Sequence, residues 1–159
     1  MLNPLLERIA MTLKKTASFV TLLLLMWTAS AANAQDLRTG TLKSVVGEVS
    51  LVNSDGARSA QTGGGVLQAD RIVTGRYAST SLTLKDGTVL TVGPSTTLEL
   101  TKLQFDSTTQ EGSLALNLVQ GSIRVVTGWL AKIHPDQVKV TTPTSVVGVR
   151  GTDFIVEVP

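Results

Sequence analysis

An Asp-Gly pair between two alternating segments constrains the fold of this chain more than any other feature. Apolar and polar residues alternate in residues 81–84 and 89–92, which lie on either side of Asp86-Gly87. Such alternation buries one face of a strand and exposes the other. Asp-Gly favours a type I′ turn, in which both central residues have positive φ. The pattern therefore predicts a β-hairpin, and it indicates an all-β fold.

Short segments rich in Val, Leu, Ile and Thr continue along the chain, and Gly, Pro, Asp or Asn separate them. No segment after residue 34 shows helical periodicity over ten or more residues, although residues 127–135 are compatible with a short helical turn. This spacing is typical of a β-sandwich or of an irregular β-solenoid or roll, and no fixed repeat period distinguishes them. We expect one all-β domain over residues 42–159, after a polar lead-in at residues 35–41.

Several residues predict turns or irregular strands. Gly47 interrupts a Val-rich segment, which indicates a bulge or a close backbone approach. The apolar residues change phase around Thr101-Lys102, which predicts a bulge there. Asp55-Gly56 is a second turn signal. Asp70, just before an apolar pair, is placed to accept backbone N–H groups in a turn.

The N-terminal residues have the pattern of a cleavable, helical signal peptide. Two lysines precede an apolar run at residues 17–27, and an Ala-x-Ala sequence ends at Ala34. We expect a signal peptide over residues 1–34, with Met11 as an alternative start. The apolar run is shorter than the ~20 residues that span a bilayer. The sequence therefore predicts a periplasmic or secreted bacterial protein that keeps no stable membrane span after cleavage.

The residue types exclude several classes of function. The chain has no cysteine, so thiol chemistry and thiolate metal sites are absent, and His134 is its single histidine. Acidic and basic residues balance after residue 34, and no basic stripe indicates nucleic-acid binding. No catalytic motif accompanies His134. We expect a surface histidine, no metal, no cofactor and no enzymatic activity.

Arg150 is the charged residue whose surroundings most suggest an interaction. It lies in Val-Gly-Val-Arg-Gly-Thr, where glycines on both sides allow another backbone to approach closely. One interpretation is an arginine at a strand end that binds a carboxylate such as Asp153. The other is a contact with a partner.

Five segments, in this order, resemble the FecR domain. They are residues 47–49 (GEV), 65–75 (GVLQADRIVTG), 78–94 (ASTSLTLKDGTVLTVGP), 120–125 (QGSIRV) and 140–154 (VTTPTSVVGVRGTDF). The order and spacing of the segments carry the resemblance, which runs over nearly all of residues 42–158. The residues that match the family motifs are Asp70, Thr74, Gly75, Gly121, Pro143, Gly151, Thr152 and Phe154.

The resemblance implies an all-β extracytoplasmic module without known catalytic activity. In iron-responsive sensors such a module is the periplasmic part of a membrane-spanning regulator, which receives a signal from an outer-membrane transporter and controls a sigma factor. We therefore expect a non-catalytic binding or scaffold module of the cell envelope with a protein partner. One alternative is an accessory component of iron- or envelope-responsive signalling that acts with a separate membrane protein. The other alternative is a carbohydrate-binding module.

Overall fold

The computed structural model describes residues 38–149 and 153–159, and it has the all-β fold that the sequence predicts. The expected signal peptide at residues 1–34, with Met11, lies outside the described residues, as do Arg150, Gly151 and Thr152. The strands are β1 (Arg38–Val46), β2 (Val49–Asn53), β3 (Gly56–Ser59), β4 (Gly65–Leu67), β5 (Arg71–Thr74), β6 (Ser79–Leu84), β7 (Val89–Val92), β8 (Thr97–Phe105), β9 (Gly112–Val126), β10 (Val138–Thr141), β11 (Val146–Gly148) and β12 (Asp153–Val158). The short helix α2 (Trp129–Ile133) and the 3-10 turn η1 (Pro135–Gln137) lie between β9 and β10, within the region expected to hold a helical turn.

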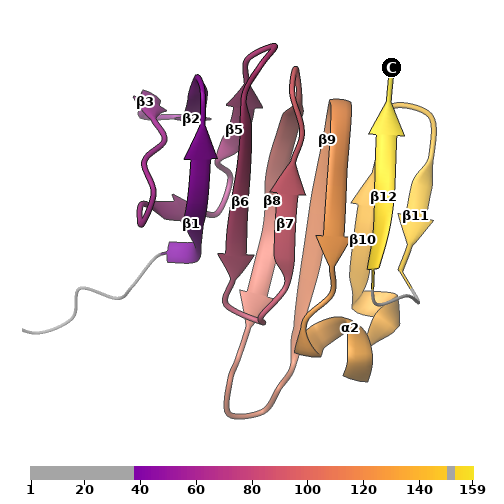
Figure 1. Cartoon of the computed structure of the whole chain (residues 1–159). Helices are drawn as coiled ribbons and strands as arrows, with labels where there is room; N and C mark the ends of the chain where they lie inside the picture. Colours follow the sequence, from indigo (N-terminus) through magenta and orange to yellow (C-terminus); the bar gives the residue numbers. More distant parts are fainter. Residues whose placement is uncertain (1–37, 150–152) are drawn as a thin grey trace, which may run out of the picture. The chain divides into compact units, whose positions relative to one another are not determined.

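The described strands form one sheet, in the order β3-β2-β5-β8-β9-β7-β6-β1-β4. Neighbours along this path are antiparallel, β12 pairs antiparallel with β9, and β10 pairs in parallel with β9 and antiparallel with β11. The sheet curls into two half-sheets, and the second lies in front of the first in Figure 1. The first half-sheet contains β3, β2, β5, β8, the N-terminal part of β9, β10 and β11. The second contains β4, β1, β6, β7, the C-terminal part of β9 and β12.

Four of the passages from one half-sheet to the other are tight corners. They lie at Gly47, at residues 75–78, at residues 93–96 and at Gly121. Gly47 and Gly121 have φ of +72° and +87°, which a residue with a side chain rarely adopts. A Cβ at Gly121 would also lie 2.6 Å from Cα of Thr96. Glycine is therefore required where β9 bends.

Hydrogen bonds join each corner to its neighbour. The N–H of Gly75 donates to the carbonyl of Glu48 at 2.9 Å. The buried hydroxyl of Thr74 donates to the carbonyl of Gly93 at 2.6 Å and accepts the N–H of Thr96 at 2.9 Å. Backbone groups that leave the strand ladder at the corners are thus satisfied inside the molecule, as buried polar groups must be.

The two half-sheets share one apolar core. Its buried members are Leu42, Val49, Leu51, Val66, Ile72, Ala78, Leu82, Leu84, Leu90, Val92, Leu98, Leu100, Leu103, Leu114, Leu116, Leu118, Ile123, Val125, Leu130, Val138, Val140 and Val149. Most come from strands in which every second residue points inward. Phe154, Val156 and Val158 of β12 pack against this core but are only half-buried, so the core is less completely covered at β12.

The hairpin of β6 and β7 lies where the sequence predicts it, but the expected type I′ turn is wrong. Gly87 has φ of +81°, whereas Asp86 does not have positive φ. The N–H of Gly87 donates to the carbonyl of Leu84, and the N–H of Leu84 donates to the carbonyl of Thr88. This is a three-residue loop with glycine in the left-handed position. Asp86 instead uses its carboxylate to accept the N–H of Thr88 at 3.0 Å.

The polar lead-in is also corrected, because β1 begins at Arg38. Residues 38–41 pair with β4 and β6, and the buried hydroxyl of Thr39 donates to the carbonyl of Val66 at 2.9 Å. The sequence did not predict this part of the strand, because its side chains are mostly polar. Pairing with β4 and β6 makes it a strand. The bulge expected near Thr101-Lys102 is confirmed by a register shift between Leu100 and Lys102. The irregularity expected at Gly47 is a corner.

Candidate functional site

Asp70, a residue of the FecR-like motif, is the centre of a buried polar cluster. Its carboxylate is fully buried and accepts the N–H of Leu67 at 2.7 Å, which is the bonding expected of it. It also accepts hydrogen bonds from both terminal nitrogens of Arg58 and from the side-chain amide of Asn53. Three separate parts of the chain meet at this carboxylate. The cluster therefore links β3 to β4, which lie at opposite ends of the strand order, and the protein itself occupies the acceptor positions of the carboxylate.

Asp86 and Gly87 form a second anchored turn. The Asp86 carboxylate is buried and accepts the hydroxyl of Thr88 at 2.7 Å, and the Asp86 carbonyl accepts the N–H of Trp129 at 2.9 Å. The N–H of Gly128 donates to the Thr88 hydroxyl at 3.0 Å. The hairpin tip therefore holds the start of α2 and positions Trp129 at the surface.

The other predicted residues are distributed over the fold. Thr74, Gly75 and Gly121 lie at the corners, and Asp55-Gly56 lies in the turn between β2 and β3, where Gly56 has φ of +123°. Two further residues of the FecR-like motif lie elsewhere. Pro143 is in the exposed turn between β10 and β11, and Phe154 is half-buried in β12. Most of the described motif residues thus build the frame and do not converge on one site.

The edge of the sheet at β12 is a candidate binding surface. β12 pairs with β9 on one side, and its other edge carries no strand among the described residues. Three large apolar side chains are exposed near it: Ile155 of β12 is 69% exposed, Val126 of β9 is 38% exposed, and Trp129 of α2 is 58% exposed. We call the outer edge of β12 and these three side chains the β12 surface.

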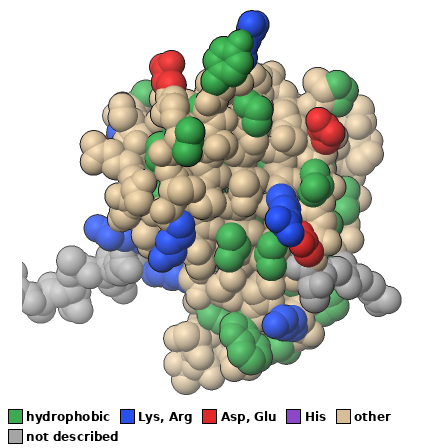
Figure 2. Space-filling view, in the orientation of Figure 1, with side chains coloured by type: hydrophobic (Ala, Val, Ile, Leu, Met, Phe, Trp, Pro, Cys, Tyr) green, Lys and Arg blue, Asp and Glu red, His purple; other side chains and the backbone are tan. Residues whose placement is uncertain are grey.

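The register explains why two of these side chains share a face. Ile155 pairs with Arg124 and Asp153 pairs with Val126, so the exposed residues of β12 and β9 alternate outward together. Arg124 donates from Nε and Nη2 to the Asp153 carboxylate, with the Nε bond at 2.9 Å. Figure 2 shows hydrophobic side chains around an adjacent basic and acidic pair on this face, and a further hydrophobic group at the bottom, where α2 lies in Figure 1.

Hydrogen bonds lower the pKa of three carboxyl groups, those of Asp153, Asp106 and Glu99. A hydrogen bond from Arg124 lowers the pKa of Asp153, and the same contact raises the pKa of Arg124. The N–H groups of the turn after Asp106 lower the pKa of that carboxyl. A hydrogen bond from Asn117, together with Arg71, lowers the pKa of Glu99. One interpretation of the sequence places Arg150 beside a carboxylate such as Asp153, and among the described residues Arg124 binds Asp153.

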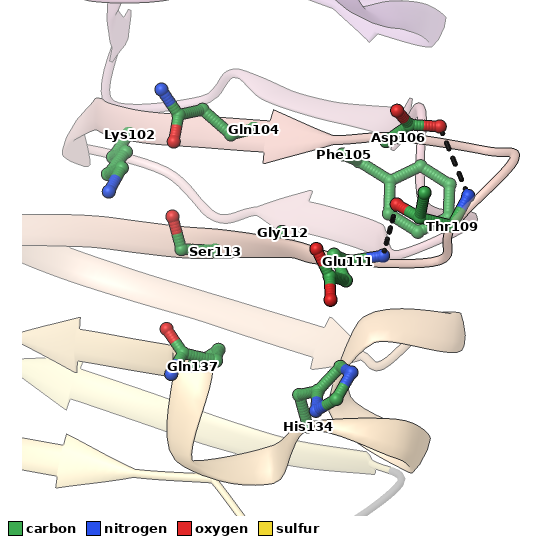
Figure 3. A pocket seen from close by; sticks show the side chains of 10 residues that line it. All are labelled: Lys102, Gln104, Phe105, Asp106, Thr109, Glu111, Gly112, Ser113, His134 and Gln137. Atoms are coloured by element: carbon green, nitrogen blue, oxygen red, sulfur yellow. Dashed lines mark hydrogen bonds between the residues drawn. The ribbon is translucent and has the colours of Figure 1, made fainter.

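A second candidate site is a groove of about 750 Å³ between the β8–β9 hairpin and the α2–η1 segment. The residues that line it are Lys102, Gln104, Phe105, Asp106, Thr109, Glu111, Gly112, Ser113, His134 and Gln137. Figure 3 shows His134 and Gln137 on one wall and Lys102, Gln104 and Ser113 on the other, with Glu111 pointing into the space between them. We call this the hairpin groove.

Neither candidate site has the residues of a metal centre. The described part of the chain holds no group of three or more His, Cys, Asp or Glu side chains that could bind a metal ion. His134 lines the hairpin groove, and no described residue forms a hydrogen-bonded nucleophile–base pair with it.

A model of the FecR protein family matches residues 70–158. The chain belongs to the FecR family. This family is regulatory and non-enzymatic, its proteins interact with other proteins, and membership suggests a role related to signalling in the cell envelope. The matched range begins at the buried carboxylate of Asp70 and ends in β12. No curated protein and no solved structure matches the chain.

No helix in residues 38–149 and 153–159 is both long and apolar enough to cross a membrane. Sequence reasoning missed two features of this FecR protein. Arg58 lies in no recognisable motif. Its role depends on the carboxylate of Asp70, twelve residues away, which the fold brings beside it. The hairpin groove could not be found either, since its walls join β8 and β9 to the α2–η1 segment. The exposed apolar residues at positions 126 and 155 gave a weak signal, because they occupy the outward phase of their strands.

Proposed function

We propose that this FecR protein is a non-catalytic binding module of the cell envelope and that the β12 surface receives an extended segment of a protein partner. One observation carries the proposal: β12 is a six-residue edge strand with an exposed Ile155 at its centre. An open edge offers N–H and C=O groups that a partner strand can pair with. The family's known interactions with other proteins support this role.

The edges at β3, β4 and β11 are less suitable for a partner strand. β4 and β11 have three residues each, and the N–H of Leu67 in β4 already donates to Asp70. β3 has four residues and holds Arg58, whose guanidinium is bound in the Asp70 cluster. Natural proteins protect edge strands by such shortening and by covering. β12 is longer and lacks this protection on its outer edge within the described residues.

Burial of the apolar side chains of the β12 surface would add to the binding free energy that backbone pairing with a partner strand supplies. Trp129 is an exposed aromatic residue held at the end of the anchored hairpin, and buried aromatic residues often dominate protein interfaces. The Arg124–Asp153 ion pair lies on the same outward face as Ile155 and Val126, whose spacing follows from the register of β12 and β9. The surface therefore favours a partner strand with apolar residues at alternate positions.

The proposal is tested by affinity capture from envelope extracts of cells that produce the full chain. We compare wild type with Ile155→Lys, which places a charge at the centre of the β12 surface without touching the core. Val46→Lys is the matched control. Like Ile155, Val46 is an exposed β-branched apolar residue in a strand, and it is 57% exposed at the C-terminal end of β1, outside the β12 surface. We expect a protein that wild type and Val46→Lys capture and that Ile155→Lys loses. Equal capture by all three proteins, or no specific partner with wild type, would contradict the proposal.

A regulatory role in iron- or envelope-responsive signalling is the second candidate, and membership of the FecR family favours it. The partner strand would then belong to a membrane protein or an outer-membrane transporter. We expect deletion of the gene to change transcription under iron limitation or envelope stress, and Ile155→Lys to reproduce the change. Unaltered transcription in the deletion strain under both conditions would remove this candidate and leave the binding role to the capture experiment.

A further inference from the structure

The hairpin groove contains one buried polar atom that the fold itself does not use. Elsewhere in residues 38–149 and 153–159 the buried side-chain nitrogen and oxygen atoms have hydrogen-bond partners, as at Asp70 and Asp86. In the groove, the Oγ atom of Ser113 is buried and accepts or donates no hydrogen bond among the described residues. Orphaned buried polar atoms are uncommon in native structures and call for an explanation. A ligand in the groove explains this one, because Ser113 is part of the groove lining.

The strand register shows how these side chains are arranged on the outer face of the first half-sheet. Gln104 of β8 lies opposite Ser113 of β9, and Gln137 directly precedes Val138, which lies opposite the next residue of β9. Two amide side chains therefore lie at positions beside the orphaned hydroxyl, Gln104 from β8 and Gln137 from the end of η1. The Gln137 amide nitrogen also donates to the Asp136 carboxylate at 3.2 Å, which leaves its carbonyl oxygen to accept. A side-chain amide has two N–H donors and a carbonyl acceptor, and a hydroxyl can both donate and accept a hydrogen bond.

The next position along β9 has two lysines in the same arrangement. Ala115 lies opposite Lys102 of β8 and opposite Lys139 of β10, and both lysines are exposed. The bulge in β8 leaves Thr101 and Lys102 both exposed, and the Thr101 hydroxyl donates to the carbonyl of Ala115 at 2.8 Å. The bulge therefore places Lys102 on the outer face, opposite the small side chain of Ala115.

Charge is distributed unevenly along this face. Lys102 and Lys139 lie at one end, and Glu111 projects into the groove near its other end, beside His134 (Figure 3). The Asp106 carboxylate is engaged with the N–H groups of Thr108 and Thr109, so it is held in the turn. A ligand that fits this face has hydroxyl groups for Glu111 and the amides, and an anionic group for the lysines.

We propose that the hairpin groove binds a carboxylated oligosaccharide. Sugar rings present adjacent hydroxyls that donate and accept at once, which matches two glutamines, a serine and a histidine. A uronic-acid carboxylate matches the lysine pair, and charge-assisted hydrogen bonds of this kind are the stronger ones. The proposal is independent of the β12 surface and gives the carbohydrate-binding alternative a defined place. Trp129 is not part of this site.

The test is isothermal titration calorimetry on the protein purified from cells that produce the full chain. The probe is an oligogalacturonate. Dextran oligomers supply hydroxyls without charge, and poly-glutamate supplies carboxylates without sugar hydroxyls. We expect the oligogalacturonate to bind at least about tenfold more tightly than either of the others. Binding of poly-glutamate with equal affinity would show simple charge attraction and overturn the proposal, as would equal binding of dextran or no binding of the oligogalacturonate.

Variants separate the site from general surface effects. We expect Lys102→Gln and Lys139→Gln each to weaken oligogalacturonate binding by about tenfold, and Lys43→Gln, an exposed lysine of β1, to leave it unchanged. Ser113→Val should weaken binding while the midpoint of unfolding stays the same or rises, because the hydroxyl has no partner in the folded protein. Loss of stability in Ser113→Val with unchanged affinity would assign the hydroxyl a structural role and contradict the proposal. Ile155→Lys should bind the sugar normally, so failure here is distinct from failure of partner capture.

Discussion

Arg58 holds the fully buried carboxylate of Asp70. One terminal nitrogen of Arg58 lies 3.1 Å from Oδ1, and the other contacts Oδ2, while the arginine side chain itself is 38% exposed. The pair joins β3 to the turn that precedes β5. Because only the carboxylate is cut off from water, the two residues contribute unequally to stability.

Removing Arg58 should therefore cost more than removing the charge of Asp70. Arg58→Met leaves a buried carboxylate with two neutral donors, and we expect it to lower the free energy of unfolding by about 3–5 kcal/mol. Asp70→Asn leaves an arginine that can reach water, and we expect a loss of about 2–3 kcal/mol. Chemical denaturation measures both. If the order is reversed, Arg58 does not neutralise the carboxylate in the folded protein.

Gly121 should tolerate no side chain. Gly121→Ala places a Cβ against Thr96 and forces alanine to φ near +87°, so we expect a loss of more than about 2 kcal/mol in the free energy of unfolding. Gly148→Ala is the matched control, since a Cβ there meets no atom within 4 Å. Thermal unfolding compares the two. Equal midpoints for both variants would mean that β9 does not bend at Gly121.

We expect a β-branched residue at position 87 to destabilise the protein because of the backbone conformation and not because of a steric contact. Its φ is +81°, yet a Cβ would meet no atom within 4 Å. Gly87→Val should therefore destabilise the domain by about 1–3 kcal/mol, and Gly87→Asn by clearly less, because asparagine tolerates the left-handed region. The difference between the two variants in urea denaturation checks the turn. Similar losses would point to a steric cause and against the three-residue loop.

Glu99 should add stability that depends on pH. Its pKa is lowered in the folded protein by hydrogen bonds from Asn117 and Arg71, so its contribution is complete above its unfolded pKa of about 4.3 and is lost as pH falls through the lower folded pKa. We expect Glu99→Gln to be less stable than wild type near neutral pH, and the difference in the free energy of unfolding to shrink as the pH falls through the lowered pKa of Glu99. A difference that stays constant over this fall in pH would show that the charge of Glu99 is not involved.

Sequence patterns predicted the elements of this fold better than their arrangement. Alternation located most strands and the β6–β7 hairpin, since one buried face leaves a period of two in the sequence. It could not show that Gly47 and Gly121 are corners of a curled sheet, because a bulge and a corner leave the same interruption. The turn at Asp86 has another type than the one predicted from Asp-Gly, and its contacts with Gly128 and Trp129 are tertiary features that the local pattern does not show.

The candidate sites were less accessible to sequence reasoning. Asp70 was expected to accept backbone N–H groups, and it does, but its partner Arg58 depends on the fold. The hairpin groove and the β12 surface are built from segments that only the register brings together. Residues that come together from separate segments leave no spacing motif, which is why the sequence does not single out Ser113 and Lys139.

Hydrogen–deuterium exchange on β12 in the presence of a captured partner tests the central claim most directly. The account predicts that the amides of residues 153–158 become protected when the partner is added, and that Ile155→Lys abolishes this protection. Protection confined to β3 or to the hairpin groove, with unchanged exchange in β12, would contradict it.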